Sequence, residues 1–213
     1  MSGYKNIVIE GNIGAGKTTM AKALSEYLDA RLILETFENN PFLELFYSDR
    51  NRHGFQVELF FLAERYHQLS KNLLGDIFQE YTVYDYHFSK CAIFSSINLL
   101  HEDERALYNN LFSIMDRFMP RPDILIYLHQ SIETLQAQIH QRGRDYEEEI
   151  PNEYLEAVSE GYFAAFKEVT SFPIVVINLT EGQAFSEKDL LEKLRKTINQ
   201  EWKRGINHIS MAL

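Results

Sequence analysis

The segment NIVIEGNIGAGKTTMAKAL, residues 6–24, constrains the fold of this 213-residue chain more than any other. An apolar run ends at Glu10, the pattern G-x-x-x-x-G-K-[ST] follows it, and a stretch with helical periodicity comes next. This pattern forms a phosphate-binding loop when a strand precedes it and a helix follows it. The sequence therefore predicts a strand, a nucleotide-binding loop and a helix in direct succession.

The residue types in this loop are suited to hold the phosphates of a nucleotide. Its glycines let backbone N–H groups turn toward phosphate oxygens, and the helix that starts near Lys17 adds the positive end of its dipole. Lys17 is expected to reach the outer phosphates, and the Thr18 hydroxyl is expected to ligate Mg²⁺. The predicted nucleotide-binding residues are Gly11, Asn12, Ile13, Gly14, Ala15, Gly16, Lys17, Thr18 and Thr19. Kinases, switches and motors share this loop, so it does not fix the reaction.

The composition is that of a folded globular chain. Hydrophobic residues make up 45% of it, and the length is enough for one α/β domain with a sizeable core. A formal net charge of -10 disfavours binding of nucleic acid or an anionic membrane through the overall field. The single cysteine, Cys91, rules out an internal disulfide, and no apolar run approaches the roughly 20 residues of a membrane span. With no leader pattern before the first strand, we expect a cytoplasmic protein.

Alternating strand and helix patterns predict an α/β fold. The strand candidates are the buried runs 6–10, 31–35, 123–128 and 174–179 and the more polar run 82–86. After the helix that follows Lys17, the helical patterns cover about 55–73, 88–100, 103–118, 131–142, 152–169 and 186–203. This order predicts a P-loop NTPase-type three-layer sandwich, in which helices flank a five-stranded parallel sheet. We expect one domain over residues 4–203 and a C-terminal tail over residues 204–213.

Two acids close neighbouring predicted strands. Glu35 ends the second run and Asp85 lies at the end of the third. Ligands of such sheets bind beyond the carboxyl ends of the strands, so both acids are expected beside the outer phosphate. A hydroxyl acceptor of a phosphoryl group needs a carboxylate that orients it and takes its proton. The alternatives are acids in ordinary caps or turns, or an Asp85 that only supports Mg²⁺.

The segment QRGRDYEEEI indicates a short lid over about residues 142–150. Arg142 and Arg144 could clamp a transferring phosphoryl group, whose charge spreads over three oxygens, and Gly143 supplies a flexible point. The alternative is a glycine that caps a helix whose last turn carries basic residues.

With these motifs in order, the chain resembles the bacterial deoxynucleoside kinases, and specifically their deoxyguanosine kinase branch. The resemblance covers about residues 4–180 and rests on GNIGAGKTT, ETFENNPFLELFY, GFQVELFFLAERYHQL, DYHFSK and QRGRDYEEEI. It implies transfer of the γ-phosphoryl group of ATP to the 5′-hydroxyl of a deoxynucleoside, with Mg²⁺, in nucleotide salvage. It also implies a homodimer that pairs long helices, for which the candidates are 55–73 and 103–118.

The resemblance also implies roles for individual residues. Glu35 lies near the 5′-hydroxyl, and Asp85 matches the acid of the family's E/D-R-S motif. Either carboxylate could be the proton acceptor. Tyr47 and Glu147 match partners of the sugar 3′-hydroxyl, and the two arginines of the predicted lid match the lid arginines of the family.

The E/D-R-S motif departs from the family pattern here. It reads Asp85-Tyr86-His87, so Tyr86 stands where the family has an arginine that helps the 5′-hydroxyl and the phosphate. Lys90, one helical turn later, could restore the charge. Both Tyr86 and Lys90 are therefore substrate-binding candidates.

A second departure concerns the base. Many of these kinases carry a base-reading Gln where this chain has Glu58; Arg65 lies seven residues on, on the same helical face, and Cys91 replaces the acid that usually partners that arginine. Guanine offers two adjacent donors, which an ionised carboxylate can accept, and Arg65 could donate to its O6 or N7. The changes favour deoxyguanosine as the acceptor. Alternatively, Glu58 is a surface acid or an ion-pair partner of Arg65.

Three other functions stay open from the sequence. One is a kinase of the same family that prefers deoxyadenosine or deoxycytidine. Another is a thymidylate-type nucleoside monophosphate kinase, which would need basic residues near Glu35 to hold the phosphate of its acceptor, whereas residues 35–46 contain none. The last is a P-loop switch without a small-molecule acceptor, which gives no use to the two acids at the strand ends.

Overall fold

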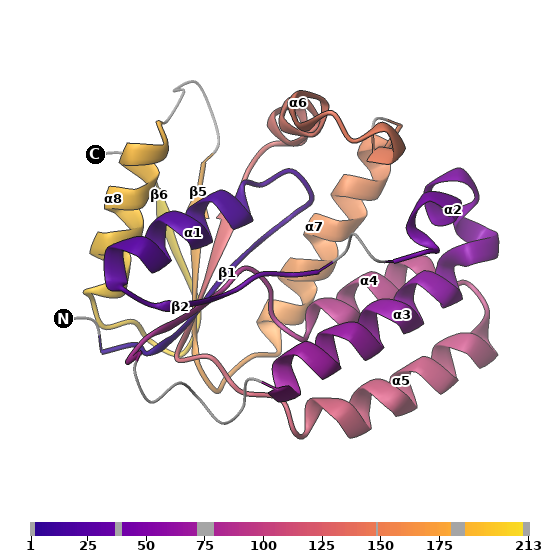
Figure 1. The fold of residues 1–213 in the computed structure, drawn as a ribbon, viewed down its shortest axis with the longest axis horizontal. Coiled ribbons are helices and arrows are strands. Elements are labelled where there is room, and N and C mark those ends of the chain that lie inside the picture. Colours follow the sequence, from indigo (N-terminus) through magenta and orange to yellow (C-terminus); the bar gives the residue numbers. More distant parts are fainter. Residues whose placement is uncertain (1–2, 37–39, 72–78, 148, 180–185, 211–213) are drawn as a thin grey trace.

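The computed structural model describes residues 3–36, 40–71, 79–147, 149–179 and 186–210. A single parallel sheet lies between two groups of helices (Figure 1). The strand order is β2-β3-β1-β4-β5-β6, so β1 lies between β3 and β4. The expected α/β fold with a parallel sheet flanked by helices is confirmed.

The strands are short and mostly buried. They are β1 (Asn6–Gly11), β2 (Arg31–Ile33), β3 (Thr82–Tyr84), β4 (Ile124–His129), β5 (Pro173–Asn178) and β6 (Gly205–Ser210). The adjacent inner strands β1, β4 and β5 are buried along almost their whole length, which explains their nearly continuous apolar sequences.

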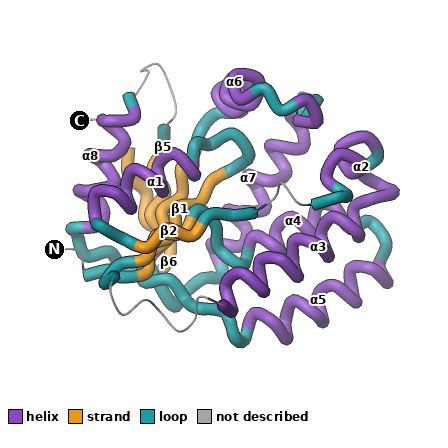
Figure 2. Tube along the Cα trace, in the orientation of Figure 1, coloured by secondary structure: helices purple, strands orange, loops and turns teal. Residues whose placement is uncertain are grey.

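The helices form the two outer layers. They are α1 (Lys17–Leu28), α2 (Leu43–Ser48), α3 (Arg50–Lys71), α4 (Lys90–Asn98), α5 (Glu102–Asp116), α6 (Ile132–Arg142), α7 (Asn152–Lys167) and α8 (Glu187–Ile198), with a 3₁₀ turn η1 (Asp145–Glu147). Helices α1 and α8 pack together on one side of the sheet, and α3, α4, α5 and α7 lie on the other (Figure 2). Among the described residues, none of these helices has both the length and the apolar character needed to cross a bilayer.

The expectation of five strands is wrong, because residues 205–210 add β6 to the sheet. The preceding helix ends at Ile198, where the Trp202 indole N–H donates to the carbonyl of Thr197 at 2.8 Å. Gly205 then adopts a φ of 82°, which only glycine takes without strain, and the chain turns into β6 parallel to β5. This edge strand is half-exposed and has only two isoleucines among polar residues, so it lacks the apolar run of its neighbours.

The long helix also begins earlier than its periodicity indicates. Helix α3 starts at Arg50 rather than near residue 55, and residues 72 and 73 of the predicted helix lie outside the described residues. Helix α2 precedes it as a short helix that the sequence did not predict. Together α2, α3, α4 and α7 enclose the space beyond the carboxyl ends of β1, β2 and β3.

Candidate active site

The loop between β1 and α1 is built on tight backbone packing. Gly14 and Gly16 have φ values of 81° and 78°, in the left-handed region that favours glycine. A Cβ on Gly14 would also lie 2.8 Å from the carbonyl oxygen of Leu135. The loop therefore needs glycine at these positions, and it leads directly into the N-terminus of α1 at Lys17.

Two side chains attach the loop to the rest of the domain. The amide of Asn12 donates to the Leu155 carbonyl at 2.7 Å and to the Ser159 hydroxyl at 2.8 Å, both on α7. The Gln130 amide donates to the carbonyl of Ala15 at 3.1 Å. The side chain of Asn12 thus anchors the loop rather than pointing at a ligand, and Gln130 is an anchor that the sequence did not indicate.

Lys17 and the two threonines form the first turn of α1. The Lys17 ammonium donates to the carbonyl of Asn12 at 2.8 Å. Burial, and after it the charge of Lys90, lowers the pKa of Lys17 to about 8. Thr18 and Thr19 are exposed at the start of the helix.

Asp85 links the loop to the second predicted acid. Its carboxylate accepts from the Thr18 hydroxyl at 2.7 Å and from the backbone N–H of Glu35 at 2.6 Å. Burial is the largest effect on Asp85 and raises its pKa above the usual value. A hydroxyl and a carboxylate beside a phosphate loop are hard oxygen ligands, so these residues fit Mg²⁺.

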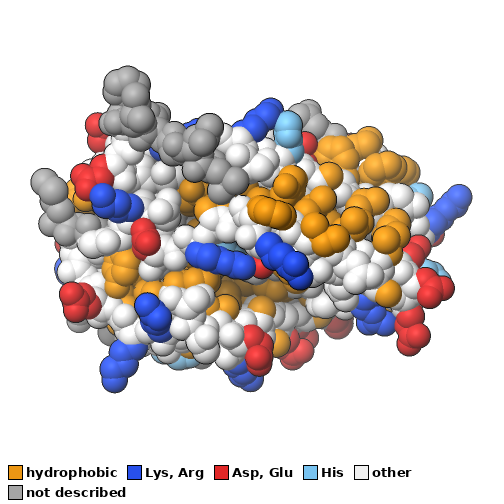
Figure 3. Space-filling view, turned by 90° about the horizontal axis from the view of Figure 1, so that it is seen from below, with side chains coloured by type: hydrophobic (Ala, Val, Ile, Leu, Met, Phe, Trp, Pro, Cys, Tyr) orange, Lys and Arg blue, Asp and Glu red, His pale blue; other side chains and the backbone are white. Residues whose placement is uncertain are grey.

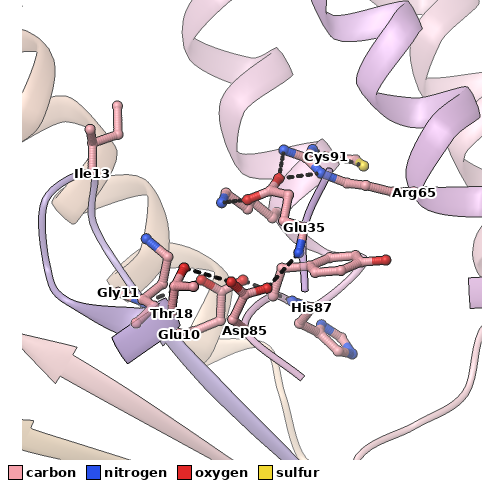
Figure 4. Close-up of polar contacts among 12 residues, drawn as sticks. Glu10, Gly11, Ile13, Thr18, Glu35, Arg65, Asp85, His87 and Cys91 are labelled. Atoms are coloured by element: carbon pink, nitrogen blue, oxygen red, sulfur yellow. Dashed lines mark hydrogen bonds and ion pairs between the residues drawn. The ribbon is translucent and has the colours of Figure 1, made fainter. Parts of the chain in front are cut away.

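Glu35 is held by two cations (Figure 4). One carboxylate oxygen accepts from Arg65 Nε at 2.8 Å and from Nη2 at 2.6 Å, and the other accepts from Lys90 Nζ at 2.6 Å. Burial alone raises the pKa of Glu35, but the charges of Lys90 and Arg65 outweigh it and hold the pKa well below its usual range. Glu35 is therefore an anion at neutral pH. Arg65 also donates from Nη1 to Cys91 Sγ at 3.2 Å.

Lys90 and Tyr86, the two substrate-binding candidates at the altered motif, have different positions in the structure. The Lys90 side chain is 8% exposed and lies in the cluster around Glu35. Tyr86 is fully buried, and its hydroxyl donates to the Gln68 side chain at 2.6 Å instead of reaching the cavity. Besides Arg65, the positive charge beside Glu35 thus comes from Lys90, four residues after Tyr86.

Most of the residues singled out from the sequence line one cavity. They are Ile13, Lys17, Thr18, Glu35, Tyr47, Glu58, Arg65, Asp85, Lys90, Arg142, Arg144 and Glu147. They come from the loop, from strand ends, from α2, α3 and α4, and from the segment after α6. The fold therefore brings residues from distant parts of the sequence together in one cavity, beside the phosphate loop.

The cavity is also lined by residues that were not among the site residues predicted from the sequence. They are Leu43, Phe46, Val57, Phe61, Phe94, Asn98 and Tyr154. Arg65 lies over the ring of Phe61, with 4.6 Å from Cζ to the ring centroid, and Lys90 lies 5.6 Å from the centroid of Phe94. Aromatic residues at helical spacing are usually core, so their pattern gave no signal for these contacts.

The predicted lid arginines are paired with one carboxylate. Arg142 ends α6 and Arg144 follows it, and both form ion pairs with Glu147. The Glu147 side chain is 6% exposed, whereas the arginines are about one-third exposed. Arg142 and Arg144 therefore both line the cavity, and the buried carboxylate of Glu147 holds them in place.

The turn before η1 has the geometry of a helix cap. Gly143 has a φ of 66° and caps α6, so the capping alternative for this glycine is confirmed. Within the predicted lid, 142–150, Tyr146 stacks on Tyr47 of α2 with 5.8 Å between ring centroids. Residue 148 lies outside the described residues.

Glu58 lies on α3 and faces the same cavity. It is 2% exposed, so it is not a surface acid, and the ion pair of Arg65 goes to Glu35 rather than to Glu58. One oxygen of Glu58 accepts from the Asn98 amide at 2.6 Å. The other is buried and has no hydrogen-bond partner among the residues that the structure describes. Burial raises the pKa of Glu58 to about 7, against the opposing charge of Arg65 and the Asn98 hydrogen bond.

Comparison with known proteins places the chain. The family model described as deoxynucleoside kinase matches residues 7–202. The chain belongs to the deoxynucleoside kinase family. It is 38% identical over 167 residues to the deoxyguanosine kinase of Bacillus subtilis, covering 76% of this chain and 79% of that protein. It is 28% identical over 200 residues to the deoxyadenosine/deoxycytidine kinase of the same organism, covering 88% of each.

Solved structures agree with this assignment. The structure of deoxyadenosine kinase from M. mycoides with bound dCTP superimposes with a TM-score of 0.77 and 27% sequence identity, covering 91% of this chain and 98% of that one. The protein is thus an ATP-dependent deoxynucleoside kinase, which sets aside the monophosphate kinase and the switch as interpretations of the loop.

Proposed function

We propose that this kinase transfers the γ-phosphoryl group of ATP to the 5′-hydroxyl of a purine deoxynucleoside, with deoxyguanosine as the preferred acceptor. The observation that carries the base preference is the buried, unpartnered oxygen of Glu58 in the cavity of a deoxynucleoside kinase. A buried acceptor without a donor is costly, so a ligand that supplies the donor gains affinity. The similarity to a deoxyguanosine kinase supports the same choice.

Guanine matches this oxygen chemically. Its N1–H and exocyclic amino group are adjacent donors, and an ionised carboxylate is an acceptor only. Adenine presents a donor beside an acceptor on the same edge, which an amide matches better. Arg65 keeps N–H groups on Nη1 and Nη2 beyond those that Glu35 and Cys91 use, and these can donate to guanine O6 or N7.

Glu35 is proposed to bind and orient the 5′-hydroxyl. Its carboxylate is ionised, faces the cavity and lies near the phosphate loop. A low pKa makes Glu35 a weak base, which suffices when the transition state is loose and the hydroxyl proton leaves late. The oxygens of Asp85 are already used by Thr18 and by the N–H of Glu35, which favours Asp85 as a support for Mg²⁺.

The remaining charged groups are proposed to stabilise the transferring phosphoryl group. Lys17 and the two lid arginines line the cavity, and cations there offset the charge that spreads over the equatorial oxygens. Mg²⁺, when bound beside Thr18 and Asp85, would neutralise charge on the β- and γ-phosphates. Tyr47 and Glu147, which also face the cavity, are proposed partners of the sugar 3′-hydroxyl.

Deoxyadenosine is a second candidate acceptor, because Glu58 has a pKa of about 7. When protonated, its carboxyl group presents a donor beside an acceptor and so resembles the amide of glutamine. The similarity to a deoxyadenosine/deoxycytidine kinase and to a deoxyadenosine kinase structure points the same way.

The proposal is tested by offering deoxyguanosine, deoxyadenosine, deoxycytidine and thymidine separately to the purified protein with ATP and Mg²⁺. The expected result is 5′-phosphorylation with the highest kcat/KM for deoxyguanosine. The highest value for deoxyadenosine would replace the first candidate by the second. No transfer to either purine deoxynucleoside would contradict the proposed function.

We also propose that the kinase is a homodimer. Leu107, Ile114 and Phe118 are each more than half exposed, and their spacing places them on one face of α5 and its continuation. Figure 3 views the molecule from below, the side where α5 lies in Figure 1, and hydrophobic side chains gather over one half of this face. Contiguous exposed apolar surface of this kind is typical of a protein–protein interface.

A further inference from the structure

The two oxygens of Glu58 have different surroundings. Oε1 accepts from the side-chain amide of Asn98 at 2.6 Å, whereas Oε2 is buried without a partner among the described residues. Glu58 is 2% exposed and Asn98 is 7% exposed, and both line the cavity. The carboxylate is therefore held at one oxygen, and the other is left for a ligand.

The backbone is built to bring these two side chains together. Gly54 lies one helical turn before Glu58 on α3, and a Cβ on Gly54 would lie only 2.5 Å from the carbonyl oxygen of Asn98. Helices α3 and α4 can approach this closely only because Gly54 has no side chain. Asn98 is the last residue of α4, so this close contact fixes the position of its amide relative to Glu58.

Hydrogen-bond chemistry fixes the direction of the contact. When Glu58 is ionised, its carboxylate is an acceptor only, and the amide of Asn98 donates to it from its NH₂ group. The neighbouring cations do not compete for this oxygen, because Arg65 and Lys90 contact Glu35. Without Asn98, the carboxylate of Glu58 would be free to rotate about its last torsion, which is broad for a terminal carboxylate.

We propose that Asn98 is a specificity-positioning residue, which holds Oε1 of Glu58 so that Oε2 faces the hydrogen-bond donors of the acceptor's base. This inference rests on the proposed function, in which Glu58 distinguishes guanine from adenine. Asn98 acts through Glu58, and its effect falls on the choice of base rather than on phosphoryl transfer.

The test compares Asn98→Ala and Asn98→Asp with the wild type. Asn98→Asp keeps the size of the side chain but removes its NH₂ donor, so it separates hydrogen bonding from packing. The ratio of kcat/KM for deoxyguanosine to that for deoxyadenosine is expected to fall at least about tenfold in both variants, mainly through KM for deoxyguanosine. Ser96→Ala is the matched control on α4, because Ser96 is exposed and its hydroxyl contacts only the carbonyl of Ile93 within its helix.

A double-mutant cycle shows whether Asn98 acts through Glu58. In a Glu58→Gln background, Asn98→Ala should change the ratio less than about twofold. An equal loss of kcat/KM for both acceptors, an unchanged ratio, or a fall in the Glu58→Gln background as large as in the wild type would overturn the inference.

A wild type that prefers deoxyadenosine would refute the proposed guanine preference, while the coupling between the two positions would still decide the role of Asn98. If a variant has lost turnover, base preference is measured instead as the ratio of its affinities for the two deoxynucleosides, determined by calorimetry.

Discussion

At the scale of single residues, the site depends on how a few buried charges compensate one another. Glu35 is one buried anion with two cations, so the cluster around it keeps a net positive charge without help from Tyr86. Lys90 completes the cluster, since its ammonium contacts the oxygen that Arg65 leaves open. A site of this kind can hold Glu35 ionised and still attract a phosphoryl group.

Replacing Lys90 tests this arrangement. Lys90→Met keeps much of the length of the side chain and removes its charge. We expect kcat to fall by about 10²–10³ for every acceptor, because a preorganised charge beside the transferring group is lost. Lys90→Arg is the control and should keep most of the activity. Steady-state kinetics that put the Met variant within about threefold of the wild-type kcat would argue against a role for Lys90.

A second prediction concerns pH and follows from the raised pKa of Glu58, about 7. Below this pH the carboxyl group is protonated and offers a donor; above it the group is an anion and accepts only. The ionised fraction rises about tenfold between pH 6 and pH 8, so the ratio of kcat/KM for deoxyguanosine to that for deoxyadenosine should rise at least about tenfold.

Taking a ratio removes the effect of groups that act on both acceptors. Lys17, with a pKa of about 8, titrates in the same range but contacts the phosphate end of the cavity. The charged groups that act on Glu58 itself are Arg65, Lys90 and Glu35. In Glu58→Gln the ratio should be flat across this range. A wild-type ratio that does not change with pH would be evidence against a titrating Glu58 in base recognition.

Local sequence patterns identified the residues with charge and hydrogen-bonding chemistry, but not all of their partners. Glu35 and Asp85 were predictable because they lie just beyond the ends of β2 and β3, and the loop glycines because their motif needs them. The contact of Lys90 with Glu35 spans 55 positions along the chain, so only the fold brings them together. Asn98 carries no motif at all, since an asparagine at a helix end is usually a cap or a surface residue.

At the scale of the elements, the packing of α3 against α4 brings Glu58 and Asn98 together in the lining of the cavity. Gly54 lies where these two helices pack tightly, because it faces the carbonyl oxygen of Asn98, the last residue of α4. Glycine in a helix ordinarily weakens it by roughly 0.5–1 kcal/mol relative to alanine. At Gly54, however, the helices need the absence of a side chain in order to pack, so replacing this glycine with alanine is expected to destabilise the protein.

Gly54→Ala should therefore lower the free energy of unfolding by about 1–3 kcal/mol, because the added Cβ would lie 2.5 Å from the Asn98 carbonyl oxygen. Denaturant unfolding measures this change. The matched control is Gly161→Ala in α7, where the nearest atom is a methyl group of Ile93 at 3.0 Å that can move aside, so the loss should be smaller. Stabilisation of the chain by Gly54→Ala would contradict the packing argument.

The type and order of the long elements followed from periodicity, and their ends did not. The first five strands lie where the apolar runs indicate, because buried parallel strands are apolar on both faces. The sequence did not predict β6 or α2, because β6 is a half-exposed edge strand and α2 spans only Leu43–Ser48. Their positions depend on contacts with β5 and α3 rather than on their own sequences.

At the scale of the whole molecule, the catalytic cavity and the apolar face of α5 lie on separate parts of one structure. The cavity is lined by residues of α2, α3, α4 and the segment after α6 but by none of α5, whereas Leu107, Ile114 and Phe118 are more than half exposed. Dimerisation through this face would therefore leave the cavity accessible.

Light scattering tests the proposed homodimer. The wild type should have about twice the chain mass of 25.0 kDa, and Ile114→Glu should shift it toward the monomer without loss of folding, because Ile114 is 57% exposed in one chain. Leu45→Glu, which changes an exposed leucine on α2, should leave the mass unchanged. A wild type that stays monomeric at micromolar concentration would exclude a stable dimer.

The most direct measurement of the central claim is the acceptor preference of Glu58→Gln at pH 8, where the wild-type carboxylate is mostly ionised. The account predicts that the wild type prefers deoxyguanosine, and that the variant lowers the deoxyguanosine to deoxyadenosine ratio of kcat/KM at least about tenfold, or 1.4 kcal/mol. An unchanged ratio would show that the unpartnered oxygen of Glu58 does not select the base.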